Sequence, residues 1–274
     1  MRLGLGTMRC CGAGAWGEPR DLTAVQDTIQ VAYRQGIRYF DSAGFYGPDV
    51  ALRLLRDNLP QDHDAVISTK VGINRQNRSD WTVDASPQAI GQQVERDLQT
   101  LGVDCLDLVF LRLGDGQHLP RDPRPLQESV VALRDLQQAG KLRAIGLSQC
   151  SLTDLQDAQQ VATISAVQNL YNIKHQEDRQ FLSYCTAEQL DYWAYYPLGM
   201  GGFSKKPSAT LQQMTERYQC SVSQLCLAWL LAQSPRMHPI FGTSNVDHLA
   251  ENLYSEQIQI SAVDRARLSQ FWDV

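Results

Sequence analysis

Apolar residues gather along the chain in short runs that alternate with amphipathic stretches from one end to the other. Most of the runs are apolar along their whole length, which is typical of strands covered on both faces of a parallel sheet. The stretches between them repeat apolar residues at helical spacing. The pattern predicts eight strands, over residues 3–7, 37–41, 65–70, 106–111, 143–148, 166–170, 191–196 and 238–243.

Capping residues set the limits of the predicted helices. Ser86 followed by Pro87 predicts an N-cap and a first-turn proline, and Gly102 suits the left-handed position after the helix end. Ser151 with Asp154 resembles a capping box at the start of another helix. One more apolar stripe, which we interpret as core packing without a chemical role, comprises Val222, Leu225, Cys226, Trp229 and Leu230.

Eight strands that alternate with helices fit either a closed barrel or an open doubly wound sheet. An open sheet that binds a dinucleotide carries G-x-G-x-x-G where an early strand turns into a helix. Residues 4–9 are G-L-G-T-M-R, so the third glycine is missing and the segment does not resemble the start of a helix. We therefore predict an α/β fold, a (β/α)8 TIM barrel, in which residues 1–274 form a single domain.

Composition and charge narrow the classes of partner. Hydrophobic residues make up 43% of the chain and charged residues 20%, which is the balance of a globular protein with a large buried core. The net charge is −5 and there is no block of Lys or Arg, which argues against a nucleic-acid or anionic-membrane surface. We therefore expect a small-molecule partner, and a monomer or weak homo-oligomer as the assembly.

Cysteine and histidine usage points to a reduced compartment and a site without metal. The seven cysteines are scattered and contain no C-x-x-C pair, which predicts free thiols in the cytoplasm. The chain shows no apolar leader and no run of the roughly 20 apolar residues that a membrane helix needs. The five histidines form no H-x-H or H-x-x-x-H pair, so we predict no bound metal.

Polar residues stand at the carboxyl ends of several predicted strands, where the active site of such a barrel lies. Asp41 closes the second strand and Lys70 the third, and either charge would be costly inside the sheet unless the two are paired. Taken alone, such a pair is better interpreted as a structural salt bridge. The other polar residues at or near strand ends are Arg112, Ser148, Gln149, Gln168 and Asn169.

Tyr46, in the loop that follows Asp41, changes this interpretation. A lysine ammonium near a phenol favours the phenolate, so we expect Lys70 to lower the Tyr46 pKa from its ordinary value near ~10. A tyrosine with such a pKa can donate and accept a proton near neutral pH. The three residues together indicate carbonyl reduction or alcohol oxidation.

The same residues lie in motifs that resemble those of the aldo-keto reductases. Residues 36–47, G-I-R-Y-F-D-S-A-G-F-Y-G, resemble the family's block around its catalytic aspartate and tyrosine, and S-T-K at 68–70 resembles its catalytic-lysine strand. In unbroken order, G-L-S-Q at 146–149, V-Q-N-L-Y-N at 167–172, Y-P-L-G at 196–199 and the segment 242–252 resemble the cofactor motifs. The resemblance implies a barrel oxidoreductase with a nicotinamide cofactor.

The resemblance also implies a role for each matching position. Tyr46 would be the general acid in reduction, tuned and oriented by Asp41 and Lys70, and Tyr195 would stack on the nicotinamide ring. The nicotinamide carboxamide would be held by Ser148, Gln168 and, where the family usually has Asn, Gln149. The other positions assigned to the cofactor are Gly6, Thr7, Met8, Leu198, Gly199, Gly202, Gly242, Ser244, His248, Glu251 and Asn252.

Arg112 departs from the family, most of whose members have His after the fourth strand. Arg stays charged near neutral pH, so Arg112 can donate hydrogen bonds to a substrate oxygen but cannot shuttle a proton. We expect it to orient the carbonyl oxygen and to exclude cationic substrates. Together with Trp81 and the segments 17–21 and 239–244, it resembles the pyridoxal reductase branch. That resemblance favours a pyridoxal-like substrate and NADPH, with NADH as the alternative cofactor.

Two other functions stay open on the sequence alone. The same residues could work oxidatively, as an NAD-dependent dehydrogenase of pyridoxal or of a sugar hemiacetal. The chain could also be a nicotinamide-binding regulatory protein with feeble turnover. The unusual Arg112 favours that second alternative, whereas the presence of Asp41, Tyr46 and Lys70 argues against it.

Overall fold

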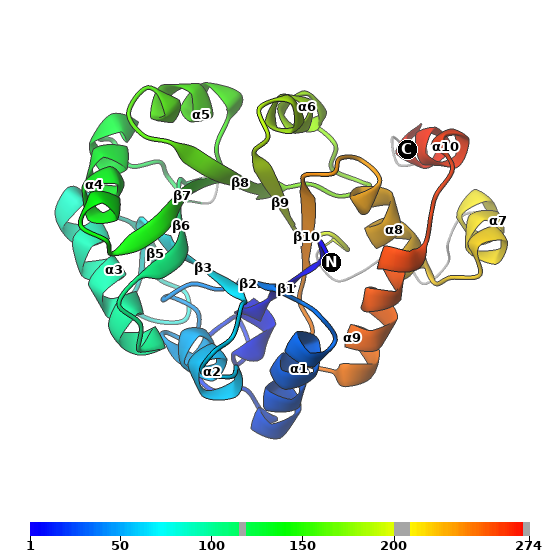
Figure 1. Cartoon of the computed structure of the whole chain (residues 1–274), viewed down its shortest axis with the longest axis horizontal. Coiled ribbons are helices and arrows are strands. Elements are labelled where there is room, and N and C mark those ends of the chain that lie inside the picture. The colour runs from blue at the N-terminus through cyan, green and yellow to red at the C-terminus, as the bar shows by residue number, and fades with distance from the viewer. Residues whose placement is uncertain (115–118, 200–208, 271–274) are drawn as a thin grey trace.

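The eight predicted strands close into a barrel. The computed structural model of the chain describes residues 1–114, 119–199 and 209–270. The barrel strands all run parallel, in the order β1-β10-β9-β8-β7-β6-β3-β2, and β2 pairs with β1 to close the ring (Figure 1). They are β1 (Gly4–Gly6), β2 (Tyr39–Asp41), β3 (Val66–Val71), β6 (Leu106–Arg112), β7 (Leu142–Ser148), β8 (Ile164–Leu170), β9 (Asp191–Tyr195) and β10 (Met237–Phe241).

Helices surround the barrel on its outside (Figure 1). Because they cover the outer face of the sheet, the strands need no polar face. The helices are α1 (Leu22–Arg34), α2 (Val50–Asn58), α3 (Pro87–Leu101), α4 (Leu126–Gln138), α5 (Leu152–Gln159), α6 (Arg179–Ala187), α7 (Ala209–Tyr218), α8 (Val222–Leu231), α9 (Val246–Leu253) and α10 (Ala262–Gln270), with the 3-10 turns η1 (Thr7–Cys10) and η2 (Tyr254–Gln257).

The capping signals in the sequence act as expected. Ser86 Oγ accepts a hydrogen bond from the backbone of Ala89, and Gly102 ends α3 at φ 70°, a conformation that costs glycine little. At the start of α5 the Ser151 side chain accepts from the Asp154 backbone, and the Asp154 side chain accepts from the Ser151 backbone. The predicted capping box is therefore complete.

One element of the fold is absent from the sequence prediction. After β3 the chain forms an antiparallel hairpin from β4 (Ile73–Arg75) and β5 (Trp81–Val83), which is a separate sheet from the barrel. Each of its strands has only three residues. The equally short β1 and β2 lie in longer predicted runs, whereas residues 74–80 of the hairpin are all polar or charged, so no apolar run marks its strands.

Apolar packing fills the barrel interior and the layer between strands and helices. In the interior, Phe110, Trp193 and Ile240 belong to one buried cluster. Gly146 lies against it, and a Cβ there would come within 2.4 Å of the Phe110 ring, so this position leaves no room for a side chain. In the outer layer, residues 225–231 of α8 are all buried, which confirms that their stripe is core packing.

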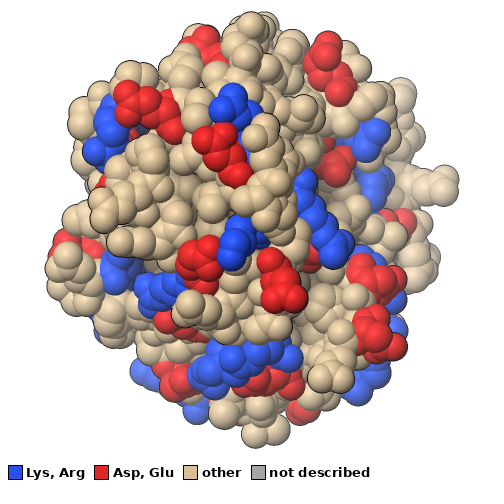
Figure 2. All heavy atoms as spheres, turned by 60° about the vertical axis from the view of Figure 1, so that its left-hand side comes forward, with Lys and Arg blue, Asp and Glu red and all other residues tan. Residues whose placement is uncertain are grey.

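The outer surface carries charges of both signs. On the face that includes α3 and α4, positive and negative side chains are interspersed (Figure 2), and ion pairs such as Lys141 with Glu95 join them. This face has none of the large single-sign field that attracts nucleic acid. All seven cysteines are free, as predicted. No helix in the described parts of the chain is long and apolar enough to cross a membrane.

Candidate active site

A buried ion pair joins the ends of β2 and β3. Lys70 Nζ lies 2.8 Å from each carboxylate oxygen of Asp41 and donates to the Ser42 carbonyl oxygen at 2.7 Å. The side chains of Lys70 and Asp41 are 1% and 7% exposed. The three protons of the ammonium thus have acceptors, as a buried charge requires. The pairing expected at these two strand ends is present.

Further donors fix the Asp41 carboxylate and backbone. Ser68 Oγ donates to Asp41 Oδ1 at 2.9 Å, and Gln168 Nε2 donates to the same oxygen at 2.6 Å. Thr7 Oγ1 donates to the Asp41 carbonyl oxygen at 3.0 Å. Residues from β3, β8 and η1 therefore hold this aspartate, and through it they hold Lys70.

Tyr46 is buried beside this pair, in the loop between β2 and α2. Lys70 Nζ lies 5.0 Å from the centroid of the Tyr46 ring, and Phe45 packs edge-on against the same ring. Burial raises the Tyr46 pKa above its ordinary value, and the lowering effect of the Lys70 charge does not offset it. The sequence prediction of a lowered pKa is therefore wrong, because it took account of the lysine but not of burial. At neutral pH the phenol holds its proton.

Arg112 ends β6 and acts on the same site. Its charge works to lower the pKa of both Tyr46 and Tyr195, so the guanidinium is within electrostatic reach of both phenols. Arg112 Nε is buried and has no hydrogen-bond partner in the described structure, although buried polar groups are nearly always paired. Arg112 therefore keeps a donor for a further group.

A cluster of amide and hydroxyl groups stands at the ends of β7 and β8. Ser148 Oγ donates to Gln168 Oε1 at 3.3 Å, and Gln149 Nε2 donates to the Tyr195 hydroxyl at 3.3 Å. Gln149 Oε1 is buried without a hydrogen-bond partner. A primary carboxamide offers two N–H donors and one acceptor, which complements such an orphaned acceptor and its neighbouring donors. The cluster fits a nicotinamide carboxamide.

Comparison with known proteins decides the family. The model of the aldo/keto reductase family matches residues 2–273 of this chain. The chain belongs to the aldo/keto reductase family. The aldo/keto reductase described here is 36% identical over 263 residues to the pyridoxine 4-dehydrogenase of Escherichia coli, a match that covers 95% of this chain and 91% of that protein. It is 35% identical over 269 residues to an uncharacterised oxidoreductase of Schizosaccharomyces pombe, with 98% and 86% covered.

Solved structures share the fold of this aldo/keto reductase. The glycerol dehydrogenase from Gluconobacter oxydans matches with a TM-score of 0.83 at 23% identity, over 98% of this chain and 90% of that one. An aldo/keto reductase from Klebsiella pneumoniae, in complex with NADP and acetate, matches with a TM-score of 0.81 at 23% identity, over 99% and 91%. Both therefore support the barrel architecture.

Several residues assigned to the cofactor lie at the same end of the barrel as the ion pair. Gly6 ends β1, directly before Thr7 and the half-buried Met8 of η1. Leu198 and Gly199, both partly exposed, follow β9. Gly202, assigned to the same loop, lies outside the described residues.

The segment after β10 places three predicted residues at the surface of this aldo/keto reductase. Gly242, Ser244 and His248 are exposed. The Asn245 side chain accepts a hydrogen bond from the His248 backbone and so caps α9. The first turn of α9 is therefore held in place while its neighbours stay accessible to a ligand.

Glu251 and Asn252 have structural contacts instead. Glu251 Oε1 accepts a hydrogen bond from Ser221 Oγ at 2.6 Å, and the Glu251 carbonyl oxygen accepts from Gln224 Nε2 at 2.9 Å. Asn252 is buried, with 6% of its surface exposed. These contacts join α9 to the start of α8, and they leave a role in binding adenine as an untested prediction for both residues.

Arg9 is a candidate that the sequence prediction missed. It is exposed on η1, and its Cγ lies 3.0 Å from where a Cβ on Gly242 would stand. A cation therefore lies against the segment to which the family resemblance assigns the adenosine end of the cofactor. The available signal was topological, because in a closed barrel the ends of the first and last strands are neighbours.

Arg75 is a second residue that the sequence prediction missed. Its guanidinium donates to the carbonyl oxygens of Gly14 at 2.7 Å, Ala15 at 2.5 Å and Arg78 at 2.7 Å. These contacts tie the loop after η1 to the hairpin β4–β5. We call this set of contacts the Arg75 clamp. Only the fold brings its partners together, so a sequence pattern offers no signal for it.

Two tryptophans complete the clamp and connect it to the active site. The Arg75 guanidinium carbon lies 5.0 Å from the Trp16 ring centroid and 4.2 Å from that of Trp81. Trp81 packs edge-on against Phe45, which in turn packs against Tyr46. Ring contacts therefore extend from Tyr46 through Phe45 to Trp81, and the Arg75 guanidinium joins Trp81 to Trp16.

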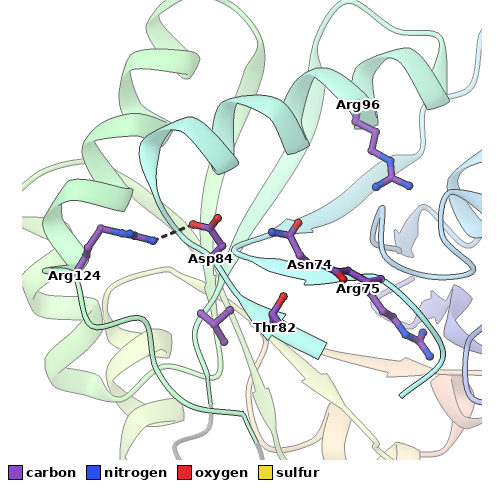
Figure 3. Close-up of a pocket in the computed structure, with 8 residues that line it drawn as sticks. Asn74, Arg75, Thr82, Asp84, Arg96 and Arg124 are labelled. Atoms are coloured by element: carbon purple, nitrogen blue, oxygen red, sulfur yellow. Dashed lines mark hydrogen bonds and ion pairs between the residues drawn. The ribbon is translucent and has the colours of Figure 1, made fainter. Parts of the chain in front are cut away.

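A polar hollow of about 600 Å³ lies at the hairpin and is distinct from the active site (Figure 3). None of the four candidate catalytic residues lines it. Arg124 forms an ion pair with Asp84 across it, and Arg96 is paired with Asp49. Two of its three arginines are thus paired with carboxylates and the third, Arg75, is engaged in the clamp, so we assign no ligand to the hollow. Its lining residues are Asn74, Arg75, Gln76, Thr82, Val83, Asp84, Arg96 and Arg124.

Proposed function

We propose that this chain is an NADPH-dependent reductase of small aldehydes and ketones, with a pyridoxal-like compound as its favoured substrate. The observation that carries the proposal is the buried Asp41–Lys70 ion pair beside Tyr46, whose phenol is neutral at neutral pH. A reductase needs a proton donor for the carbonyl oxygen, and a neutral phenol is one. The family match supports the reaction class.

Three side chains have different roles in the proton transfer. The Tyr46 hydroxyl donates its proton to the carbonyl oxygen, which becomes the alcohol. Lys70, 5.0 Å from the ring centroid, stabilises the phenolate that remains. Asp41 holds the ammonium in place and compensates its charge in a buried site. Burial of all three residues excludes water and strengthens these interactions.

The cofactor, when bound, supplies the hydride that reduces the carbonyl carbon. Ser148, Gln149 and Gln168 would hold its carboxamide, and Tyr195 would lie against its ring. We favour NADPH over NADH because Arg9, beside the exposed Gly242, offers a cation for a phosphate group. In the described residues no group of three His, Cys, Asp or Glu side chains could hold a metal ion.

A planar aromatic substrate suits the surroundings of Tyr46. The ring of Trp81 packs against Phe45 next to the catalytic tyrosine, and Trp16 is joined to it through the Arg75 clamp. Aromatic side chains favour stacking with planar rings. The name of the Escherichia coli relative, a pyridoxine 4-dehydrogenase, supports a substrate of the pyridoxal type.

The test is NADPH oxidation, followed by absorbance, with pyridoxal and a panel of simple aldehydes. We expect turnover with pyridoxal and a lower kcat/KM with aliphatic aldehydes of similar size. The reverse reaction, pyridoxine with NADP⁺ or NAD⁺, tests the oxidative alternative that the relative's name suggests. Turnover in the oxidative direction only would contradict the reductase proposal. Tight NADPH binding with no turnover in either direction would favour a regulatory role.

Arg112→His tests whether the arginine selects the substrate. We expect the KM for pyridoxal to rise by about tenfold, because a charge-assisted hydrogen bond to the substrate is lost. The variant should also accept a cationic aldehyde, such as betaine aldehyde, that the original chain rejects. The KM for pyridoxal and the activity with the cationic aldehyde are both measured near pH 8, where histidine is neutral. An unchanged KM together with an unchanged substrate range would contradict this role.

A further inference from the structure

Asp97 is a buried carboxyl group behind the catalytic residues. It lies on α3, and only 2% of its surface is exposed. In the described structure no Lys, Arg or His forms an ion pair with it, whereas buried carboxylates are usually paired. The proton transfer proposed above does not use it.

The Asp97 side chain contacts β3 directly behind Lys70. Thr69 Oγ1 donates a short hydrogen bond to Asp97 Oδ2. Thr69 is preceded by Ser68, which donates to Asp41, and followed by Lys70. Because side chains alternate along a strand, Thr69 faces α3 while its two neighbours face the barrel interior. A change at Asp97 therefore reaches Ser68 and Lys70, two of the residues that hold Asp41.

Asp97 also contacts the loop that carries Tyr46. Its Oδ1 lies 2.2 Å from where a Cβ on Gly44 would stand, so the carboxyl group rests against the Gly44 backbone. Gly44 lies between Asp41 and Tyr46, and its carbonyl oxygen accepts from the Asp49 backbone at 2.8 Å. One side chain thus supports the lysine strand and the tyrosine loop together.

Three charged groups act on Asp97 from the elements around it. Asp49, from the loop before α2, opposes ionisation, whereas Arg96 on α3 and Lys70 on β3 favour it. Arg96 and Asp49 are themselves paired and largely compensate each other. Lys70 is therefore the charged active-site residue whose electrostatic interaction with Asp97 changes when Asp97 ionises.

We propose that Asp97 is a positioning residue for the reduction, which holds Thr69 and the Gly44 segment and, through its own proton, controls how strongly Lys70 stabilises the Tyr46 phenolate. This inference rests on the proposed function. When Asp97 is ionised, its negative charge partly offsets the positive charge of Lys70 that must stabilise the phenolate. Reduction should therefore be faster when Asp97 is protonated.

The position of the proton equilibrium makes this effect observable. Burial raises the Asp97 pKa to about 7, although the hydrogen bond from Thr69 acts to lower it. In an unfolded chain the carboxyl would ionise near ~3.9. Since the folded pKa is the higher one, Asp97 favours the folded state fully at low pH and loses this contribution as pH rises through the two values.

The experiment compares the chain with Asp97→Asn, which keeps the shape and removes the proton equilibrium, and with Glu95→Gln as a surface control on the same helix. Pyridoxal reduction with NADPH is followed from about pH 5.5 to about pH 9. We expect kcat of the original chain to fall, relative to Asp97→Asn, by about threefold as Asp97 ionises. Glu95→Gln should follow the original chain. Parallel profiles for the original chain and Asp97→Asn would overturn the inference.

Thr69→Val is the second variant, and it covers the case that Asp97→Asn does not fold. Removing the Thr69 hydroxyl takes away a hydrogen bond that favours ionised Asp97, so the step in the profile should move to higher pH. A purely structural role would change kcat without moving the step. A step that stays at the same pH would contradict the proposal.

Thermal denaturation gives a readout that needs no substrate. The gap in Tm between Asp97→Asn and the original chain should widen in favour of the variant as pH rises from about 5 to about 8. A constant gap would overturn the inference. Absence of turnover with a widening gap would contradict the proposed function and leave the titration of Asp97 established. Turnover with parallel pH profiles would contradict the role of Asp97 alone.

Discussion

Replacing Tyr46 with phenylalanine is expected to lower kcat for pyridoxal reduction by about 10²–10⁴-fold, because the substitution removes the proton donor. The aromatic ring and its packing on Phe45 are kept, so the fold and the binding of NADPH should be preserved. The measurement is single-turnover NADPH oxidation together with the Kd for NADPH. Loss of turnover at unchanged Kd would identify a chemical role for the hydroxyl.

Tyr33→Phe is a matched control for this substitution. The Tyr33 hydroxyl donates to Asp64 at the surface, and Asp64 precedes the start of β3, whereas Lys70 lies near the other end of that strand. Tyr33→Phe should change kcat by a factor of roughly two at most, because the loss of a surface hydrogen bond has only a small effect. If Tyr46→Phe behaves like this control, another group donates the proton, and the proposed assignment of the acid is incorrect.

Replacing Lys70 with methionine is expected to destabilise the fold by about 3–5 kcal/mol, because it leaves the Asp41 carboxylate buried without its cation. Ser68 and Gln168 still donate to that carboxylate, but they bring no charge. Catalysis should also be lost, since nothing then stabilises the Tyr46 phenolate. The free energy of unfolding is measured by urea denaturation, and kcat on the folded fraction.

Two comparisons make the Lys70 prediction specific. The double variant Lys70→Met with Asp41→Asn should be less destabilised than the sum of the two single variants, because no uncompensated charge remains. Arg53→Met breaks the surface pair with Glu18 and should cost at most about 1 kcal/mol. Additive effects of Lys70→Met and Asp41→Asn would show that the buried pair does not act as a unit.

The sequence was sufficient to predict the features of the fold that local patterns encode. Apolar runs marked the barrel strands, and Ser86, Gly102 and Ser151 marked helix ends because capping depends on a few neighbouring residues. The polar residues at strand ends could also be recognised, because parallel strands bring their carboxyl ends together at one end of the barrel. Asp41 and Lys70 could therefore be paired in advance.

Features that depend on burial could not be predicted in this way. The Tyr46 pKa is raised because the surroundings of the phenol are closed, and no motif reports how closed a loop becomes. The hairpin strands border a polar segment at residues 74–80 and no apolar run marks them, so the sequence did not indicate where Arg75 would lie. Asp97 did leave a signal: it stands seven residues after Ile90 and three after Val94, on the apolar stripe of its helix. A carboxyl group at such a position is expected to be buried.

The Arg75 clamp has a consequence for how the substrate range of this protein can evolve. One guanidinium contacts the backbone of two loops and both tryptophan rings. Residues that share a partner do not respond independently to substitution. A substitution that moves one loop therefore also changes the contacts that hold the other loop. New specificities are more accessible through paired replacements than through single substitutions. Families that keep such a clamp should diversify these loops together, while the barrel beneath them stays constant.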